Sequence, residues 1–308
     1  SETTITRAST QQEKKEIYNF YYEIYIEELG YTNSVDHNER LLFDQLDDAA
    51  IHYAVKDNSG ELIGTYRINL FSELSDPIEQ LAPAPVANLL KRAPRDALTY
   101  TSRLMVRKEW RGDTLLAKMA THFAGELIDL KIRFDTCLSL PHLVGFYEKL
   151  GYQRYAQRVM QPGAGLEFPM VMCVQDKHHF MRVRSPLSRH PQIRSCVDQW
   201  GDGQWLQELS RPWGINHRLL ASNEFWSIAG KALLDANTTQ GLFQGLTRDT
   251  AQRLLQTSPI LEIKAGDQIT IAGFHQENLF IVLQGEFATT TAESNKLEQI
   301  RILRAGDN

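Results

Sequence analysis

A strand, a tight turn and a helix are predicted for residues 99–128, and no other stretch constrains the fold as strongly. Residues 99–106 (TYTSRLMV) are rich in β-branched and aromatic side chains, which is typical of a buried strand. The turn at residues 111–114 (RGDT) follows, with Asp113 or Thr114 as the expected helix cap, and apolar residues then recur at helical spacing. Such a unit directs unpaired backbone N–H groups and the positive end of a helix dipole at one point, which favours an anion site.

Two further segments place this unit in a mixed α/β sheet. Residues 133–140 (RFDTCLSL) form the next expected strand, and residues 141–150 form a short helix that ends at Gly151. The segments RLMVRKEWRGDTLLAKM and GFYEKLGYQRY resemble the acyl-donor loop and the FYEKLGF segment of the GNAT acyltransferase superfamily, in the same order and spacing. The resemblance covers residues 13–174. It implies an α/β (α+β) mixed sheet with flanking helices and an enzyme that transfers an acyl group from a thioester.

The chain before residue 99 predicts one helix and a hairpin. Residues 9–12 (STQQ) indicate a capping box with Ser9 as the cap of a helix that ends at Gly30. Residues 51–56 and 61–71 read as the two strands of the hairpin. Residues 72–96 contain several prolines and predict a loop with one short helix.

A finer resemblance lies within the superfamily. FDQLDDAAIHYAV, GELIGTYRINLF and TYTSRLMV look like the early strands of acyl-homoserine-lactone (autoinducer) synthases and N-acyl amino acid synthases. Those enzymes carry an acidic pair, an arginine after Gly-Thr and a Ser-Arg-Leu segment. The matching residues are Asp44, Asp47, Arg67, Ser102 and Arg103. Tyr100 replaces a glutamate of the lactone synthases, and the first helix lacks their arginine, so the N-acyl amino acid branch is favoured.

The resemblance also implies roles for these residues. Backbone N–H groups of Leu104, Met105 and Val106 would polarise the thioester carbonyl. Tyr147 would protonate the leaving thiolate, although packing alone is the alternative role for this side chain.

For the acceptor, Arg67 and Arg103 are candidates to bind a carboxylate, and pairing with Asp44 and Asp47 as scaffold is the alternative. The amine would lose its proton to water, to Asp44 or to Asp47, and the sequence does not choose among them.

The donor loop departs from the usual GNAT pattern. The expected donor-binding residues are Leu104, Met105, Val106, Arg111, Gly112, Asp113, Thr114, Leu115 and Leu116. Thr114 and Leu116 replace small residues and narrow the backbone approach that the diphosphate of acyl-CoA requires, and Asp113 adds negative charge. An acyl carrier protein, whose phosphopantetheine arm carries a single phosphodiester, is therefore the favoured donor. The rival hypotheses are an acetyl-CoA-dependent N-acetyltransferase and a non-catalytic signalling scaffold.

Composition excludes several other classes. The 308 residues carry a net charge of −5, which argues against nucleic-acid binding. Three widely spaced cysteines form neither a disulfide framework nor a zinc motif, which fits a reducing cytoplasm. No apolar run is long enough to cross a membrane, and we expect a cytoplasmic location and no metal site. The resemblance implies an enzyme that acts on a small-molecule amine.

Composition changes after the expected transferase domain, residues 1–185. The stretch from Lys177 to Arg194 is basic and lacks acids, which predicts either a solvated linker or a docking surface for acyl carrier protein. Residues 186–240 contain tryptophans and predict a linker with a packed helical segment. Residues 241–308 resemble the opening half of a cyclic-nucleotide-binding domain, a partial all-β roll. Because the phosphate-binding cassette of that family would follow Asn308, cyclic nucleotide is not expected to bind these residues.

Overall fold

The structure, a computed structural model, contains two compact units, Ser1–Gly214 with Ala265–Ile269 and Ile215–Lys264 with Thr270–Asn308. It describes residues 3–30, 37–82, 84–161, 165–214, 216, 219–221, 223–228, 246–247, 249–250, 259–267, 269, 279–293 and 296–304. The boundaries expected from the sequence, at residues 185 and 240, stay predictions.

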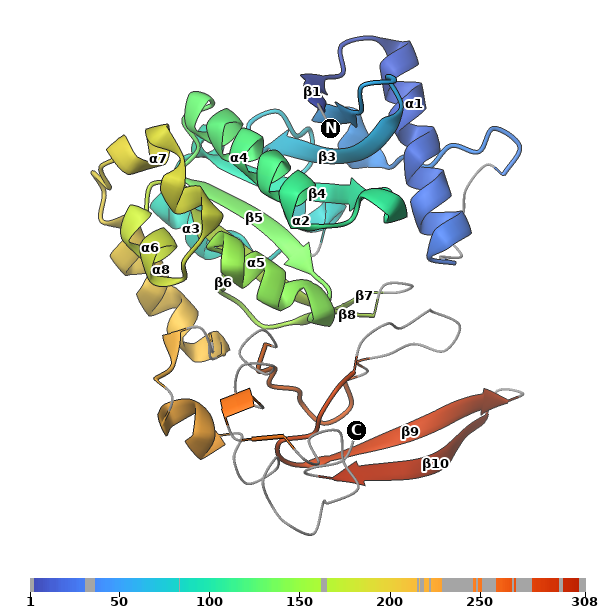
Figure 1. The fold of residues 1–308 in the computed structure, drawn as a ribbon, viewed down its shortest axis with the longest axis vertical. Helices are drawn as coiled ribbons and strands as arrows, with labels where there is room; N and C mark the ends of the chain where they lie inside the picture. The colour runs from blue at the N-terminus through green and yellow to red at the C-terminus, as the bar shows by residue number, and fades with distance from the viewer. Residues whose placement is uncertain are drawn as a thin grey trace. The chain divides into compact units, whose positions relative to one another are not determined.

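The first unit is built on an eight-stranded mixed sheet (Figure 1). Its strands are β1 (Thr4–Arg7), β2 (Ala50–Lys56), β3 (Leu62–Leu70), β4 (Leu98–Val106), β5 (Phe134–Ser139), β6 (Gln153–Arg154), β7 (Val159–Gln161) and β8 (Gly165–Cys173). The order is β1-β2-β3-β4-β5-β8-β6, with β7 paired to β8. The β4–β5 pair is parallel and the other pairs are antiparallel. The sheet confirms the predicted mixed α/β fold with flanking helices.

Helices cover both faces of this sheet. They are α1 (Gln11–Tyr22), the π-helix η1 (Glu23–Glu28), α2 (Ile78–Leu81), α3 (Ala87–Arg92), α4 (Asp113–Asp129), α5 (Val144–Leu150), α6 (Lys177–Arg182), α7 (Pro191–Ser195) and α8 (Asp202–Ser210). The 3-10 turns are η2 (Gln45–Asp47), η3 (Arg95–Ala97), η4 (Lys108–Trp110), η5 (Pro141–Leu143), η6 (Pro186–Arg189) and η7 (Arg211–Trp213). α4 and α5 lie over the same face (Figure 1). Within the described residues, no helix combines the length and the apolar character that crossing a bilayer requires.

The ends of two helices differ from the prediction. Thr10, not Ser9, caps α1: its side chain accepts from the Glu13 N–H, and Glu13 accepts from the Thr10 N–H in return. Gly112, not Asp113 or Thr114, is the cap of α4. Gly151 ends α5 with φ 119°, as predicted, and a left-handed residue of this kind favours glycine.

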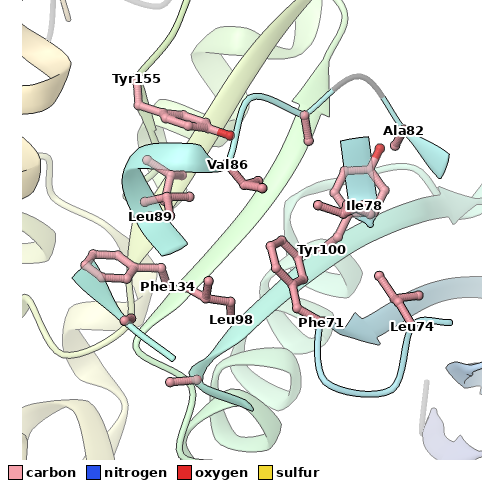
Figure 2. Close-up of a cluster of buried hydrophobic side chains, with 14 of the residues drawn as sticks. Phe71, Leu74, Ile78, Ala82, Val86, Leu89, Leu98, Tyr100, Phe134 and Tyr155 are labelled. Atoms are coloured by element: carbon pink, nitrogen blue, oxygen red, sulfur yellow. The ribbon is translucent and has the colours of Figure 1, made fainter. Parts of the chain in front are cut away.

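A core cluster of buried side chains lies on the face opposite α4 and α5. Phe71, Leu89, Leu98 and Phe134 are fully buried there, and their side chains converge between the strands and α3 (Figure 2). Burial of each such side chain stabilises the fold by roughly 1.5–3 kcal/mol. Proline-rich residues 72–96 thus form two short helices of this core, where the sequence predicted one.

The basic segment from Lys177 to Arg194 is not a solvated linker. It forms α6, η6 and α7, and its apolar side chains Phe180, Leu187 and Ile193 are buried. Its four arginines are exposed because only one face of each short helix turns to the core.

The second unit contains an antiparallel pair, β9 (Glu286–Glu293) and β10 (Lys296–Arg304). This small sheet confirms that a second β element follows the mixed sheet. Many of residues 241–308, including 270–278, lie outside the described residues, so the likeness to a cyclic-nucleotide-binding domain stays a prediction.

Candidate active site

The strands β4 and β5 form a fork. They pair at Leu98–Tyr100 with Phe134–Thr136, while β4 continues to Val106 and β5 to Ser139, all within the described residues. The other edge of β4 stays paired with β3 as far as Val106. Backbone N–H groups beyond Tyr100 that face β5 therefore have no partner in that strand, and the predicted donor contacts Leu104, Met105 and Val106 lie in this half of β4.

A bulge in β4 redirects Arg103 at the fork. The register with β3 shifts between Ser102 and Met105, and Arg103 adopts φ 56°. A left-handed arginine is uncommon, and in a strand it marks a bulge that re-aims side chains. Ser102 and Arg103 thereby both reach the face of the sheet opposite α4 and α5.

Five residues predicted as site residues meet on that face. This arginine–aspartate cluster consists of Asp44, Asp47, Arg67, Ser102 and Arg103. The Nη1 atom of Arg67 lies 2.6 Å from Asp44 Oδ1 and 2.7 Å from Asp47 Oδ1, and its Nε donates to Ser102 Oγ at 3.0 Å. Arg103 Nη2 donates to Asp44 Oδ2 at 2.8 Å. Arg67 and Arg103 are thus paired with the aspartates, as the scaffold hypothesis predicts.

The spacing of the two aspartates has a local cause. Asp44 caps the turn η2 by accepting from the Leu46 N–H, and Asp47 accepts from the Asp44 N–H. Burial would raise the pKa of Asp44, but Arg67 and Arg103 outweigh it and hold this pKa at about 2. Asp44 is 39% exposed and Asp47 only 2%, so Asp44 is the carboxylate that a substrate amine can reach.

Tyr147 lies on α5 and is partly buried. Its ring contacts those of Phe146 and Tyr152, each with centroids 5.3 Å apart. Burial raises the pKa of Tyr147 well above its usual range, which keeps the hydroxyl protonated as a proton donor must be.

Tyr25 lies beside Arg103 of the arginine–aspartate cluster. The Arg103 guanidinium lies 4.8 Å from the centre of the Tyr25 ring. Tyr25 belongs to the π-helical turn η1.

The donor loop leads into α4. The N-cap Gly112 has no side chain, so it leaves the first-turn N–H groups of the helix free of a side-chain acceptor at this position. Leu115 is buried, Thr114 is exposed and Leu116 is partly buried. Arg111 donates to the Val106 carbonyl and forms a 2.5 Å ion pair with Glu28 of η1.

One contact shows where the basic segment from Lys177 to Arg194 lies along α4. Gln192 of α7 donates to Asp129, the last residue of α4. Because α4 has 17 residues and therefore spans about 25 Å, the basic segment contacts the end of α4 that is far from the donor loop.

Among the described residues, no cluster of three histidine, cysteine, aspartate or glutamate side chains fits a metal ion.

Comparisons with known proteins identify the fold. A family model described as an acetyltransferase (GNAT) domain matches residues 20–121. No curated protein matches the chain in sequence.

Three solved structures illustrate the structural similarity. TofI, in a ternary complex with an inhibitor and MTA, shares 16% identity, with 61% of this chain and 99% of that chain covered, at a TM-score of 0.47. BjaI, a CoA-dependent acyl-homoserine lactone synthase with SAM and isopentyl-CoA, shares 10% (66% and 98% covered, TM-score 0.49). FeeM, an N-acyl amino acid synthase from uncultured soil microbes, shares 11% (59% and 96% covered, TM-score 0.46).

With TM-scores below 0.5, these similarities do not extend the ligands of those proteins to this chain. The match over residues 20–121 and the mixed sheet with its flanking helices together support a GNAT-like fold, and the chain is a transferase enzyme.

Proposed function

We propose that the enzyme is an N-acyltransferase that moves a fatty acyl group from a thioester to the amine of an amino acid or a similar small acceptor. The observation that carries the proposal is the arginine–aspartate cluster beside the fork of β4 and β5, with Tyr147 near the same fork. A transferase needs a donor site, an acceptor site and a proton donor for the leaving group, and these three features supply them.

The donor enters the fork from the donor loop. The first-turn N–H groups of α4 bind its phosphate, and the N–H groups of Leu104 to Val106 polarise the thioester carbonyl. Tyr147 protonates the thiolate that leaves.

The acceptor binds at the exposed side of the cluster. Asp44, ionised at neutral pH and accessible, attracts the ammonium group of the acceptor, and Arg103 attracts its carboxylate. A water molecule takes up the proton that the amine loses, because the lowered pKa of Asp44 makes its carboxylate a weak base and Asp47 is too deeply buried to contact the amine.

The donor is an acyl carrier protein or acyl-CoA. Asp113, Thr114, Leu116 and the ion pair of Arg111 with Glu28 all disfavour a second phosphate, which supports the carrier protein. A carrier protein would dock at the donor-loop end of α4, where Lys108 is exposed, because the basic segment from Lys177 to Arg194 contacts the opposite end.

We also propose the domain division expected from the sequence: a transferase domain to residue 185, a packed linker to residue 240 and a cyclic-nucleotide-sensor-like domain thereafter. The compact unit that extends to Gly214 suggests that the linker completes the transferase core.

The test is product analysis by mass spectrometry. The purified chain is incubated with acyl carrier protein and CoA thioesters of several lengths and with mixed amino acids. We expect N-acyl amino acids from long-chain donors. Acetylated products alone would support the acetyltransferase alternative, and no turnover with any donor would support the scaffold.

A substitution tests the proton donor. Tyr147→Phe should lower kcat by roughly ten- to a thousand-fold, because the thiolate then leaves without a proton. The control is Tyr155→Phe, which removes a buried hydroxyl that has no hydrogen-bond partner among the described residues. Equal kcat for the wild type and Tyr147→Phe, with chemistry rate-limiting, would remove Tyr147 from the mechanism.

A further inference from the structure

A buried carboxylate without a counterion lies at the base of the fork. Asp135 of β5 pairs with Thr99 of β4, one position before the last pair of the two strands. Its side chain is fully buried. Among the described residues, no lysine, arginine or histidine forms a salt bridge with it, in contrast to the aspartates of the arginine–aspartate cluster.

Three hydroxyl groups surround this carboxylate. Thr99 and Thr101 of β4 donate to Oδ1 at 2.6 and 2.7 Å, and Tyr152 donates to Oδ2 at 2.5 Å. Asp135 therefore connects β4, β5 and the chain after α5 at the point where the two strands part.

An aspartate at this buried position carries a cost in desolvation free energy. Burial of a carboxylate among neutral donors disfavours its charged form, and it raises the pKa of Asp135 to about 7. An amide or a hydroxyl could join the strands at lower cost, because neither carries a charge that must be desolvated. Stabilisation of the contact between the strands therefore does not explain why this residue is an acid.

The contacts of Tyr152 lead to the proposed proton donor. The ring of Tyr152 is almost fully buried and meets the ring of Tyr147 edge to face, with an interplanar angle of 83°. The other titratable group on this face of β5 is Cys137, and Met172 of β8 lies opposite Asp135. Asp135, Tyr152 and Tyr147 thus form a continuous series of contacts from the base of the fork to α5.

We propose that Asp135 is a positioning residue, which holds Tyr152 by its hydroxyl group and thereby fixes the ring of Tyr147 at the fork. This inference rests on the proposed acyl transfer, in which Tyr147 protonates the leaving thiolate. Asp135 touches neither donor nor acceptor in this scheme. Its carboxylate accepts the Tyr152 hydrogen bond, and its contact with Thr99 and Thr101 keeps it at the point of divergence.

The kinetic test uses two conservative substitutions. Asp135→Asn keeps one oxygen for the threonines but presents an N–H group to Tyr152, and Tyr152→Phe removes the hydroxyl while it keeps the ring. Each should lower kcat by about ten-fold, within the range of coupled pairs, with the donor KM changed less than about two-fold. Tyr155→Phe, with its unpartnered hydroxyl, is the control and should leave kcat unchanged.

The double variants decide whether the effect passes through Tyr147. In a Tyr147→Phe background, Asp135→Asn and Tyr152→Phe should cause no further loss of kcat. The same ten-fold loss in both backgrounds, or an unchanged kcat in the single variants, would overturn the proposal. Tyr152→Phe serves as the decisive variant where Asp135→Asn fails to fold.

A spectroscopic measurement separates this proposal from the proposed function. Tyrosine labelled with ¹³C at the ring Cζ atom gives one resonance per tyrosine. The Tyr147 resonance should shift in Asp135→Asn and Tyr152→Phe but not in Tyr155→Phe. This pattern in an enzyme that turns over no thioester would refute acyl transfer and retain the positioning role, whereas an unshifted Tyr147 resonance would overturn the positioning role itself.

Discussion

The two arginines of the arginine–aspartate cluster have different environments and, we infer, different roles. The Arg67 side chain is 2% exposed and contacts both aspartates and Ser102, so its hydrogen-bonding capacity is used within the protein. Asp44 is the one acidic partner of Arg103 within the described part of the chain, and the Arg103 guanidinium faces Tyr25 at the fork. Arg67 therefore holds the cluster together, whereas Arg103 can exchange its partner for a substrate carboxylate.

This difference predicts unequal effects of substitution. Arg67→Met should lower the free energy of unfolding by about 3–5 kcal/mol, because it leaves the buried Asp47 without a counterion. Arg103→Gln should cost about 1 kcal/mol and raise the KM for the acceptor instead. Urea unfolding and steady-state kinetics measure the two effects. Equal losses of stability would show that both arginines are scaffold.

The raised pKa of Asp135 predicts a pH-dependent stability of defined sign. The folded protein binds this proton up to about pH 7, whereas the unfolded chain releases it near pH 3.9. The contribution of Asp135 is therefore fully present below about pH 4 and is lost as pH rises to 7, a change of the order of 4 kcal/mol.

Comparison of the wild type with Asp135→Asn isolates this contribution. Asp44, whose pKa is lowered, changes stability with pH in the opposite sense, but it does so equally in both proteins. The stability of the wild type relative to Asp135→Asn should decrease between pH 4 and pH 7. Unfolding by urea at several pH values measures it, and a constant difference would show that Asp135 does not titrate in this range.

Elements with a clear apolar period could be predicted from the sequence. The strands at residues 51–56, 99–106 and 133–140 and the helix that begins at Asp113 have such patterns, and the structure confirms them. Helix caps could not be predicted reliably, because Ser9 and Thr10 are equally good caps and only the geometry of Glu13 selects Thr10.

The residues of the candidate site could be predicted only in part. The matched motifs indicated Asp44, Asp47, Arg67, Ser102 and Arg103, and the structure brings these residues together. The Asp135–Tyr152 contact could not be predicted from the sequence. It joins β5 to a residue that follows the C-cap of α5, and it depends on how that helix packs on the sheet. The bulge at Arg103 has no signal in a sequence pattern that otherwise indicates a regular strand.

The π-helix η1 supplies acidic residues to the arginines near the donor loop. Glu23 pairs with Arg107 at 3.1 Å, and Glu28 pairs with Arg111 at 2.5 Å. Single π-turns in helices frequently occur at functional sites. We infer that η1 weakens the binding of anionic donors, because Glu28 is paired with Arg111, an arginine that we propose contacts the donor phosphate.

Glu28→Gln should therefore lower the KM for acyl-CoA by about two- to five-fold, the effect expected of one partly exposed ion pair. The control is Glu27→Gln, on the same helix, whose carboxylate pairs with Arg40 instead. The difference between the two variants should shrink at high salt, because salt screens exposed charges. An equal KM for both variants would show that Glu28 does not affect the donor.

In the whole molecule, α8 completes the core of the transferase unit. Asp202 at the start of α8 accepts from Arg92 at 2.9 Å and from Arg133 at 2.8 Å, and it is almost fully buried. Leu206 is fully buried in the core cluster that contains Phe71 and Leu89, and Trp205 packs against Phe134. Removal of α8 would therefore leave Arg92 and Arg133 without their acid and expose part of this core.

Two truncated chains test where the transferase domain ends. A chain that ends at residue 214 should unfold cooperatively with a Tm within about 5 °C of the full chain, because α8 remains. A chain that ends at residue 185 should lose at least about 4 kcal/mol, the sum of one buried leucine and one broken buried ion pair, which lowers Tm by roughly 10 °C or more. Calorimetry of both chains measures this difference. Equal Tm values would place the boundary at residue 185, as the sequence alone predicts, and would show that α8 is dispensable to the fold.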